Sequence, residues 1–227
     1  MTLEPGDVAE GVRLYHLEFD EVADLSADAL PDRLLDALEG WRSVLRRLDL
    51  IGRDPLRYGG EAFGNLSCRV NRKEAAAPGH RAFVISASRT GERPRLGRGG
   101  WSSVTRWDVE AHRLTARGAA PPSSEAMSHA AIYDGLPTAG AVLHVHAPEI
   151  WEARAALGLP TTAGGAAAGT AAIVSSMRRL LADRRVVEGG VVAMAGHPDG
   201  VLAFGASLEE AAHRLLSALA RALGAAG

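Results

Sequence analysis

The sequence lacks the features that mark several large classes of protein. Cys68 is the only cysteine among 227 residues, which excludes an internal disulfide framework and fits a reducing compartment. No apolar run approaches the roughly 20 residues that span a bilayer. The acidic residues 1–14 contain no apolar stretch of the kind found in secretory signals. We therefore expect a cytoplasmic protein with no membrane partner.

An excess of charge of either sign is also absent. The formal net charge is −2, and arginine and lysine are spread along the chain. No basic stripe alternates with aromatic residues, so nucleic acid is not an expected partner. The sequence contains no serine nucleophile elbow, no GxGxxG motif and no P-loop. What is present is 47% apolar residues, enough to build one sizeable core in a chain of this length.

The spacing of apolar residues predicts a mixture of helices and strands. Leucines and Trp41 recur every three or four residues from Pro31 to Gly52, which is typical of an amphipathic helix. Further helices are predicted to begin at Ser123, as N-cap, and at Pro148, to cover 170–183, and to begin at Ser207. Predicted strands cover 12–19, 64–70, 82–86, 101–109, 140–146, 186–195 and 201–204, with loops at 89–100, 118–122 and 161–169. We expect an N-terminal arm (residues 1–30) followed by one α/β/α domain (residues 31–227).

His144 and His146 are the most informative residues. They lie two apart in a predicted buried strand, so both imidazoles project from the same face. Zinc is commonly bound by three histidines, and His197, in the predicted hairpin turn 196–200, is the best third ligand. Spacing alone leaves open whether these residues bind a metal or are ordinary histidines.

The remaining histidines have weaker claims to a metal site. His16, His80 and His112 are predicted at the surface, and His213 is predicted to face solvent on the last helix. His129 follows Glu125 by one helical turn, which favours a role in packing or hydrogen bonding over ligation. Cys68 is interpreted as a small core residue of its strand and not as a nucleophile.

Glu125 is the candidate acid or base. It is predicted in the first turn of a helix, where the helix dipole stabilises a carboxylate and lowers its pKa. That stabilisation alone would also explain a glutamate at this position. Backbone N–H groups at the same helix start predict an anion site. The candidate anion-binding residues lie at this start and in two donor-rich turns: Ser123, Ser124, Asn65, Ser88, Arg89, Thr90 and Gly91.

These motifs occur in an order that resembles the class II aldolase/adducin family. The order is 64–67 (GNLS), 85–91 (ISASRTG), 123–125 (SSE) with His129, 144–148 (HVHAP), and 196–197 (GH). The resemblance extends from about residue 35 to residue 222, and it is specific as a combination although each motif is weak alone.

The resemblance implies a single α/β/α domain with a central, mostly antiparallel sheet covered by helices. It also implies zinc bound by His144, His146 and His197, with Glu125 either completing the resting metal shell or acting as acid or base. A substrate phosphate would lie against Asn65, Ser123, Ser124 and the Thr90–Gly91 turn. Three imidazoles also suit Mn²⁺, Co²⁺, Ni²⁺ or Fe²⁺. Members usually form homotetramers with the site near a subunit boundary.

The implied activity is that of a metal-dependent lyase. Such an enzyme performs aldol or retro-aldol chemistry on a small sugar-phosphate-like or hydroxy-keto substrate, through an enediolate that the metal stabilises. An epimerase, a dehydratase or a decarboxylase would use the same chemistry. A non-catalytic, adducin-like interaction module is the alternative of another class, and intact ligands argue against it.

Several positions depart from the family pattern. The usual Thr-Pro-Thr/Ser-Gly turn is replaced by 86–91 (SASRTG), in which Arg89 adds a cation suited to a phosphate or a carboxylate. Where many members have Tyr-Gly-Ser/Thr, this chain has 168–170 (AGT), and we expect no tail after the last helix of the kind that carries a catalytic tyrosine in sugar-phosphate aldolases. We therefore do not expect a standard fuculose-type substrate.

Overall fold

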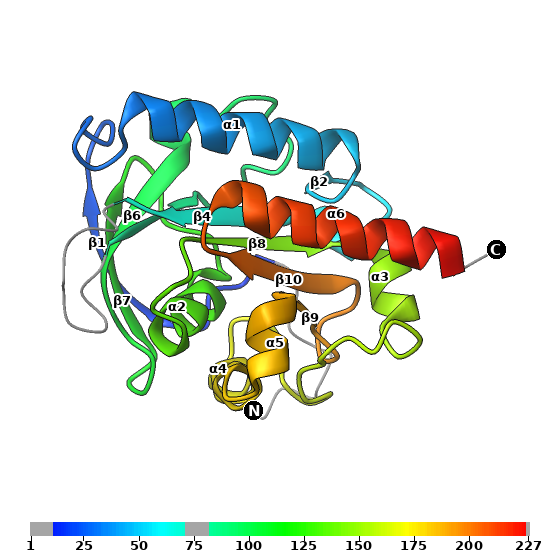
Figure 1. Cartoon of the computed structure of the whole chain (residues 1–227). Coiled ribbons are helices and arrows are strands. Elements are labelled where there is room, and N and C mark those ends of the chain that lie inside the picture. Colours follow the sequence, from blue (N-terminus) through cyan, green and yellow to red (C-terminus); the bar gives the residue numbers. More distant parts are fainter. Residues whose placement is uncertain (1–10, 71–81, 226–227) are drawn as a thin grey trace.

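The computed structural model describes residues 11–70 and 82–225, and its centre is an eight-stranded sheet (Figure 1). The strand order is β1-β7-β6-β5-β4-β8-β10-β9. All neighbouring strands are antiparallel except β1 and β7, which are parallel. The strands are β1 (His16–Glu21), β4 (Asn65–Arg69), β5 (Phe83–Ser86), β6 (Trp101–Asp108), β7 (Arg113–Gly118), β8 (Ala141–His146), β9 (Val191–Ala193) and β10 (Gly200–Gly205). A separate two-stranded sheet pairs β2 (Gly52–Arg53) with β3 (Ala62–Phe63).

Helices cover both faces of the large sheet, which confirms the predicted α/β/α layering (Figure 1). One face packs against α1 (Asp32–Arg47), α3 (Pro148–Ala153) and α6 (Leu208–Ala225), and the other against α2 (Ala126–Gly135), α4 (Ala171–Leu181) and α5 (Arg184–Gly189). Strand β8 shows the alternation that separates the two cores. Val142 packs on the α2 and α4 side, and Leu143 packs on the α1 and α6 side.

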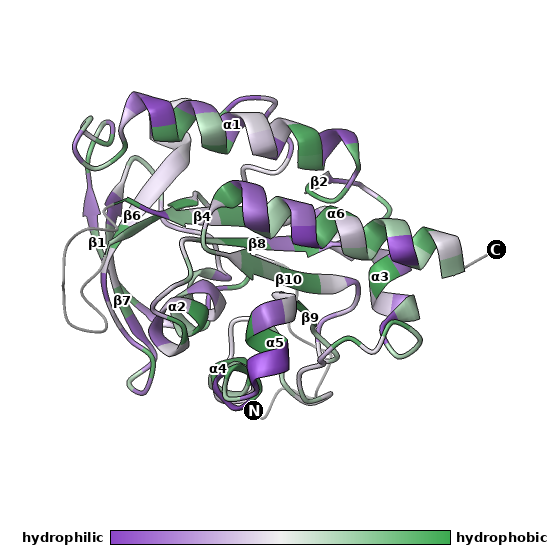
Figure 2. Cartoon of the chain, viewed as in Figure 1, coloured by the Kyte–Doolittle hydropathy of each residue, from purple (hydrophilic) through white to green (hydrophobic). Residues whose placement is uncertain are grey.

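The helices form where the sequence provides an apolar stripe and a start signal. Figure 2 shows that hydrophobic and hydrophilic residues alternate along α1, and its Leu38 and Leu45 are fully buried. At the start of α6 the Ser207 hydroxyl accepts the Glu210 N–H at 3.2 Å. The Glu210 carboxylate accepts the Ala206 N–H at 2.7 Å, one residue earlier than in the usual capping box.

The prediction of a strand over 186–195 is wrong at its beginning. Residues 184–189 form α5, and only Val191–Ala193 form a strand. Asp183 caps this short helix by accepting the Arg185 N–H at 2.9 Å, and Gly190 ends it with a left-handed φ of 64°. The apolar pair at 186 and 187 resembled a strand, but the flanking capping residues favour a helix.

Two further differences concern neighbouring elements. Strand β7 was not predicted, because its buried residues Leu114 and Ala116 are separated by exposed or half-buried polar ones and give only a short alternation. The predicted strand 12–19 is displaced to His16–Glu21, where it forms an edge strand beside β7. Residues 1–10 of the expected arm and His80 lie outside the described residues. Among the described helices, none is long and apolar enough to span a membrane.

Candidate metal centre

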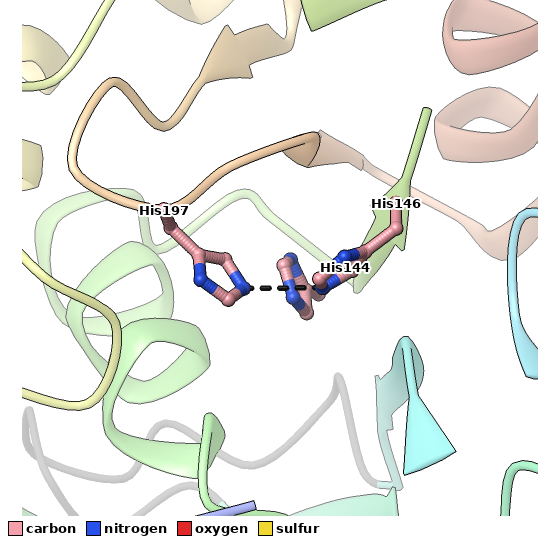
Figure 3. A group of neighbouring side chains, drawn as sticks. All are labelled: His144, His146 and His197. Carbon is pink, nitrogen blue, oxygen red and sulfur yellow. Dashed lines mark hydrogen bonds between the residues drawn. The ribbon is translucent and has the colours of Figure 1, made fainter. Parts of the chain in front are cut away.

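The structure brings His144, His146 and His197 together at one end of the sheet (Figure 3). His144 and His146 come from β8, and His197 comes from the turn between β9 and β10. One ring nitrogen from each histidine lies within 4.8 Å of the others, and the Nε2 atoms of His146 and His197 are 3.1 Å apart. In an ideal tetrahedral zinc site, two imidazole nitrogens lie about 3.3 Å apart, so this separation suits the ion.

Burial keeps the three imidazoles neutral. It lowers the pKa of His197 to about 4, and it holds the pKa values of His144 and His146 well below their usual range, with neighbouring histidines adding to the effect. Neutral imidazole is the form that binds a metal. Within the described residues, neither ring nitrogen of His144 makes a hydrogen bond of normal geometry. Since a buried donor or acceptor without a partner is costly, this donor set fits a divalent cation.

Two glycines allow His197 to reach the end of β8. A Cβ atom on Gly200 would lie 2.4 Å from the His197 ring, and one on Gly196 would lie 2.5 Å from the Ala166 carbonyl oxygen. Gly200 also pairs with His146 across the sheet, which sets the register that places the turn over the strand end. The turn therefore needs glycine on both sides of the histidine for reasons of space.

Glu125 occupies the N-cap position of α2 and is 3% exposed. Its Oε2 accepts a hydrogen bond from the Ser128 hydroxyl at 3.0 Å. Burial raises the pKa of Glu125 to about 7, so the predicted lowering at a helix start is wrong: desolvation outweighs the opposing hydrogen bond from Ser128. Among the described residues, the group of converging ligand atoms consists of the three histidines and does not include a Glu125 oxygen.

The predicted N-cap role of Ser123 is also wrong, because α2 begins at Ala126. The Ser123 hydroxyl instead accepts the Glu125 N–H at 3.2 Å and shapes the turn before the helix. The Ser123 carbonyl accepts a hydrogen bond from the Tyr15 hydroxyl at 2.8 Å. Tyr15 was not identified from the sequence, since no local motif marks it, yet it is buried beside Glu125 and that burial raises its pKa. Ser124 is buried in the same turn.

Asn65 is paired with His144 across β4 and β8, so both side chains share the face that carries the histidines. It is 5% exposed, and its Oδ1 has no hydrogen-bond partner within the described part of the chain. A buried acceptor next to the histidines is consistent with a polar ligand at this position.

The predicted anion turn at 88–91 is largely occupied by internal contacts. The Ser88 N–H donates to the Pro121 carbonyl at 2.9 Å, and the Thr90 hydroxyl donates to the Ala87 carbonyl at 2.8 Å. The Gly91 carbonyl accepts a hydrogen bond from Arg46 at 3.0 Å. Arg89 is exposed and lies 3.7 Å from the Glu61 carboxylate.

The other histidines largely follow expectation. His129 is fully buried, and its Nδ1 lies 2.7 Å from the Ser67 hydroxyl, as a packing role requires. His16 and His213 are exposed. His112 is half-buried, and its Nε2 lies 2.9 Å from the Gly169 carbonyl oxygen. Cys68 is half-buried in β4, at the edge of the core.

A family model and solved structures identify the relatives of this chain. The model described as the class II aldolase and adducin N-terminal domain matches residues 56–222. The chain belongs to this family. No curated protein sequence matches it significantly. Solved structures similar to this class II aldolase/adducin chain include YgbL from Escherichia coli, a putative aldolase/epimerase/decarboxylase, at 17% identity and a TM-score of 0.61, with 87% of this chain and 88% of that one covered.

Two further structures share the fold of this family member. The L-fuculose-1-phosphate aldolase of Thermus thermophilus has 20% identity and a TM-score of 0.55, with 84% of this chain and 92% of that chain covered. The N-terminal class II aldolase domain of a protein from Thermoplasma acidophilum has 17% identity and a TM-score of 0.56, covering 91% of this chain and 100% of that one. Identities this low show a common fold.

Proposed function

We propose that this class II aldolase/adducin chain is a zinc-dependent lyase that cleaves or forms a carbon–carbon bond beside a ketone in a small molecule. The observation that carries the proposal is the convergence of three buried, neutral histidines from two elements on one point. A packed core has no need of such a cluster, because neither ring nitrogen of buried His144 makes a hydrogen bond of normal geometry among the described residues, and burying such a group is unfavourable.

The histidines would hold the cation, and a bound divalent cation would act as a Lewis acid toward the charge that develops on the ketone oxygen. Glu125 is the proposed acid or base. With a pKa of about 7, its carboxyl group exchanges a proton readily near neutral pH. Asn65 would orient the substrate beside His144 through its Oδ1 atom. The turns at Ser123–Ser124 and 88–91 remain proposed anion contacts.

Metal analysis tests the proposal directly. Wild-type protein purified with sufficient zinc should retain close to one ion per chain, and His144→Ala should lose it. His213→Ala, which changes an exposed histidine on α6, serves as the matched control and should retain the ion. Wild-type protein without bound metal would contradict the proposal and would favour an adducin-like interaction module.

The product identifies the reaction. Release of an aldehyde from phosphorylated or unphosphorylated ketoses would support a lyase, and it should be lost in Glu125→Gln. An epimer, an enone or CO₂ as the product would instead assign epimerase, dehydratase or decarboxylase activity to the same site. We also propose that the chain acts as a homotetramer, which light scattering would test.

A further inference from the structure

The strap, residues 57–63, lies against the metal centre and was not identified from the sequence. The Tyr58 ring contacts the His146 ring edge-to-face, with 4.2 Å between centroids and 68° between planes. The Phe63 ring lies 5.4 Å from His146. The strap therefore packs directly on one of the proposed ligands and restricts the orientation of its ring.

Tyr58 also reaches the turn that carries His197. Its hydroxyl donates a hydrogen bond of 2.6 Å to Asp199 Oδ2, which lies two residues beyond His197. The Asp199 carbonyl accepts the Ala147 N–H at 2.8 Å, one residue beyond His146. Tyr58 thus contacts His146 through its ring and the turn that carries His197 through its hydroxyl.

The surroundings hold Tyr58 in this position. Its backbone adopts a left-handed φ of 51°, which is uncommon for a residue with a large side chain and persists only where contacts maintain it. Arg57 donates to the Tyr58 hydroxyl at 2.9 Å and to the Asp49 carboxylate at 2.7 Å. The Arg57 guanidinium also lies 4.8 Å from the centroid of the Phe63 ring. These contacts hold the Tyr58 side chain in place between His146 and Asp199.

We propose that Tyr58 is a positioning residue for the metal centre: through its hydrogen bond to Asp199 and its ring contact with His146, it fixes the separation of His146 and His197. The inference rests on the proposed metal-binding function. Backbone hydrogen bonds join the turn that carries His197 to the end of β8, and the Tyr58 hydroxyl adds a side-chain link to the same turn. Groups that orient metal ligands from outside typically change metal affinity by about 10- to 100-fold when they are removed.

Cobalt binding provides the test, because Co²⁺ suits imidazole sites and its visible spectrum reports coordination geometry. Tyr58→Phe keeps the ring and removes only the hydroxyl. Asp199→Gly removes the carboxylate and suits the left-handed φ of 62°. Each should weaken Co²⁺ affinity about 10-fold and alter the spectrum of the saturated protein. Asp199→Asn retains an acceptor and should restore most of the affinity.

The double variant shows whether Tyr58 and Asp199 act through their shared hydrogen bond or affect Co²⁺ affinity independently. Because Tyr58 and Asp199 act through one hydrogen bond, the double variant Tyr58→Phe/Asp199→Gly should bind Co²⁺ no more weakly than the weaker single variant. The matched control is Tyr133→Phe, which removes a buried hydroxyl that is bonded to Ser67 at 2.8 Å and makes neither of the contacts that Tyr58 makes with His146 and Asp199. It should leave both affinity and spectrum unchanged.

Unchanged affinity in both single variants, or losses that simply add in the double variant, would overturn the proposed link. If Tyr58→Phe does not fold, the Asp199 variants decide the question in the same way. Failure of the underlying function has a different signature, since wild-type protein itself would then bind no Co²⁺.

Discussion

Replacing Glu125 by glutamine should make the metal-free protein more stable, and increasingly so as the pH rises. Glu125 is 3% exposed, and the only side-chain hydrogen bond of its carboxyl group within the described residues is the one donated by Ser128. Glutamine has nearly the same shape and can accept the same bond through its amide oxygen. The substitution therefore removes an ionisable group from the core while leaving the packing intact.

The magnitude follows from the difference between folded and unfolded pKa values. Burial raises the pKa of Glu125 from 4.5 to about 7, so folding favours the neutral acid. The stability of the neutral form is fully present below pH 4.5 and is lost as the pH rises through 7. Each pKa unit corresponds to about 1.4 kcal/mol, so the complete loss is about 3 kcal/mol. Glu125→Gln should be more stable than wild type by about 1 kcal/mol at pH 5 and by about 3 kcal/mol at pH 8.

Urea denaturation of both proteins provides the measurement, at several pH values and with a chelator present. The chelator matters because a bound cation would lower the pKa of a nearby carboxyl group and reduce the effect. A difference in unfolding free energy that does not change with pH would refute the raised pKa. It would also be refuted if the free energy of unfolding of wild type rose relative to that of the variant as the pH increased.

Three further predictions concern the histidines, the arginine-rich loop and one glycine contact. Burial lowers the pKa of His197 to about 4, so its contribution to stability is full above pH 6.5 and is lost as the pH falls below that value. The free energy of unfolding of metal-free protein, measured by urea titration, should therefore fall by about 2 kcal/mol less between pH 7.5 and pH 5 in His197→Gln than in wild type. Buried Arg42 donates to loop carbonyls of Thr90 and Arg93, so Arg42→Ala should cost about 2–4 kcal/mol and expose the loop to trypsin. A Cβ atom on Gly91 would lie 2.1 Å from a backbone oxygen, so Gly91→Ala should lower the free energy of unfolding by about 2–3 kcal/mol. Gly40 lies on the open face of α1, so Gly40→Ala should raise it by about 0.5–1 kcal/mol. Thermal melts of both variants would check this.

Local patterns were sufficient to predict the layered fold and most of its elements. Apolar spacing indicated α1 and the last helix, and a run of small, branched and aliphatic residues indicated β8 as a buried strand. The errors arose where local signals compete. The apolar pair at 186 and 187 predicted a strand, but in the structure these residues belong to a short helix that Asp183 and Gly190 cap. Ser123 carried a capping signal but was used for the turn before α2.

The candidate site divides in the same manner. Strand geometry alone placed His144 and His146 on one face, since residues two apart in a strand share a side. His197 was proposed as the third ligand from its place in a predicted hairpin turn, and the family resemblance supported it, but only sheet register sets where that turn lies. Tyr15 and Tyr58 escaped detection because each acts across more than 100 residues of sequence, on Ser123 and Asp199 respectively.

The sequence by itself determined which side chains are available and which of them share a strand face, because those properties depend on residue type and on the two-residue repeat of a strand. Tertiary structure alone decided their chemical state. The pKa of Glu125 rises to about 7, opposite to the shift expected at a helix start, because burial removes water from the carboxyl group. Burial likewise keeps His144, His146 and His197 neutral, and therefore able to bind a metal.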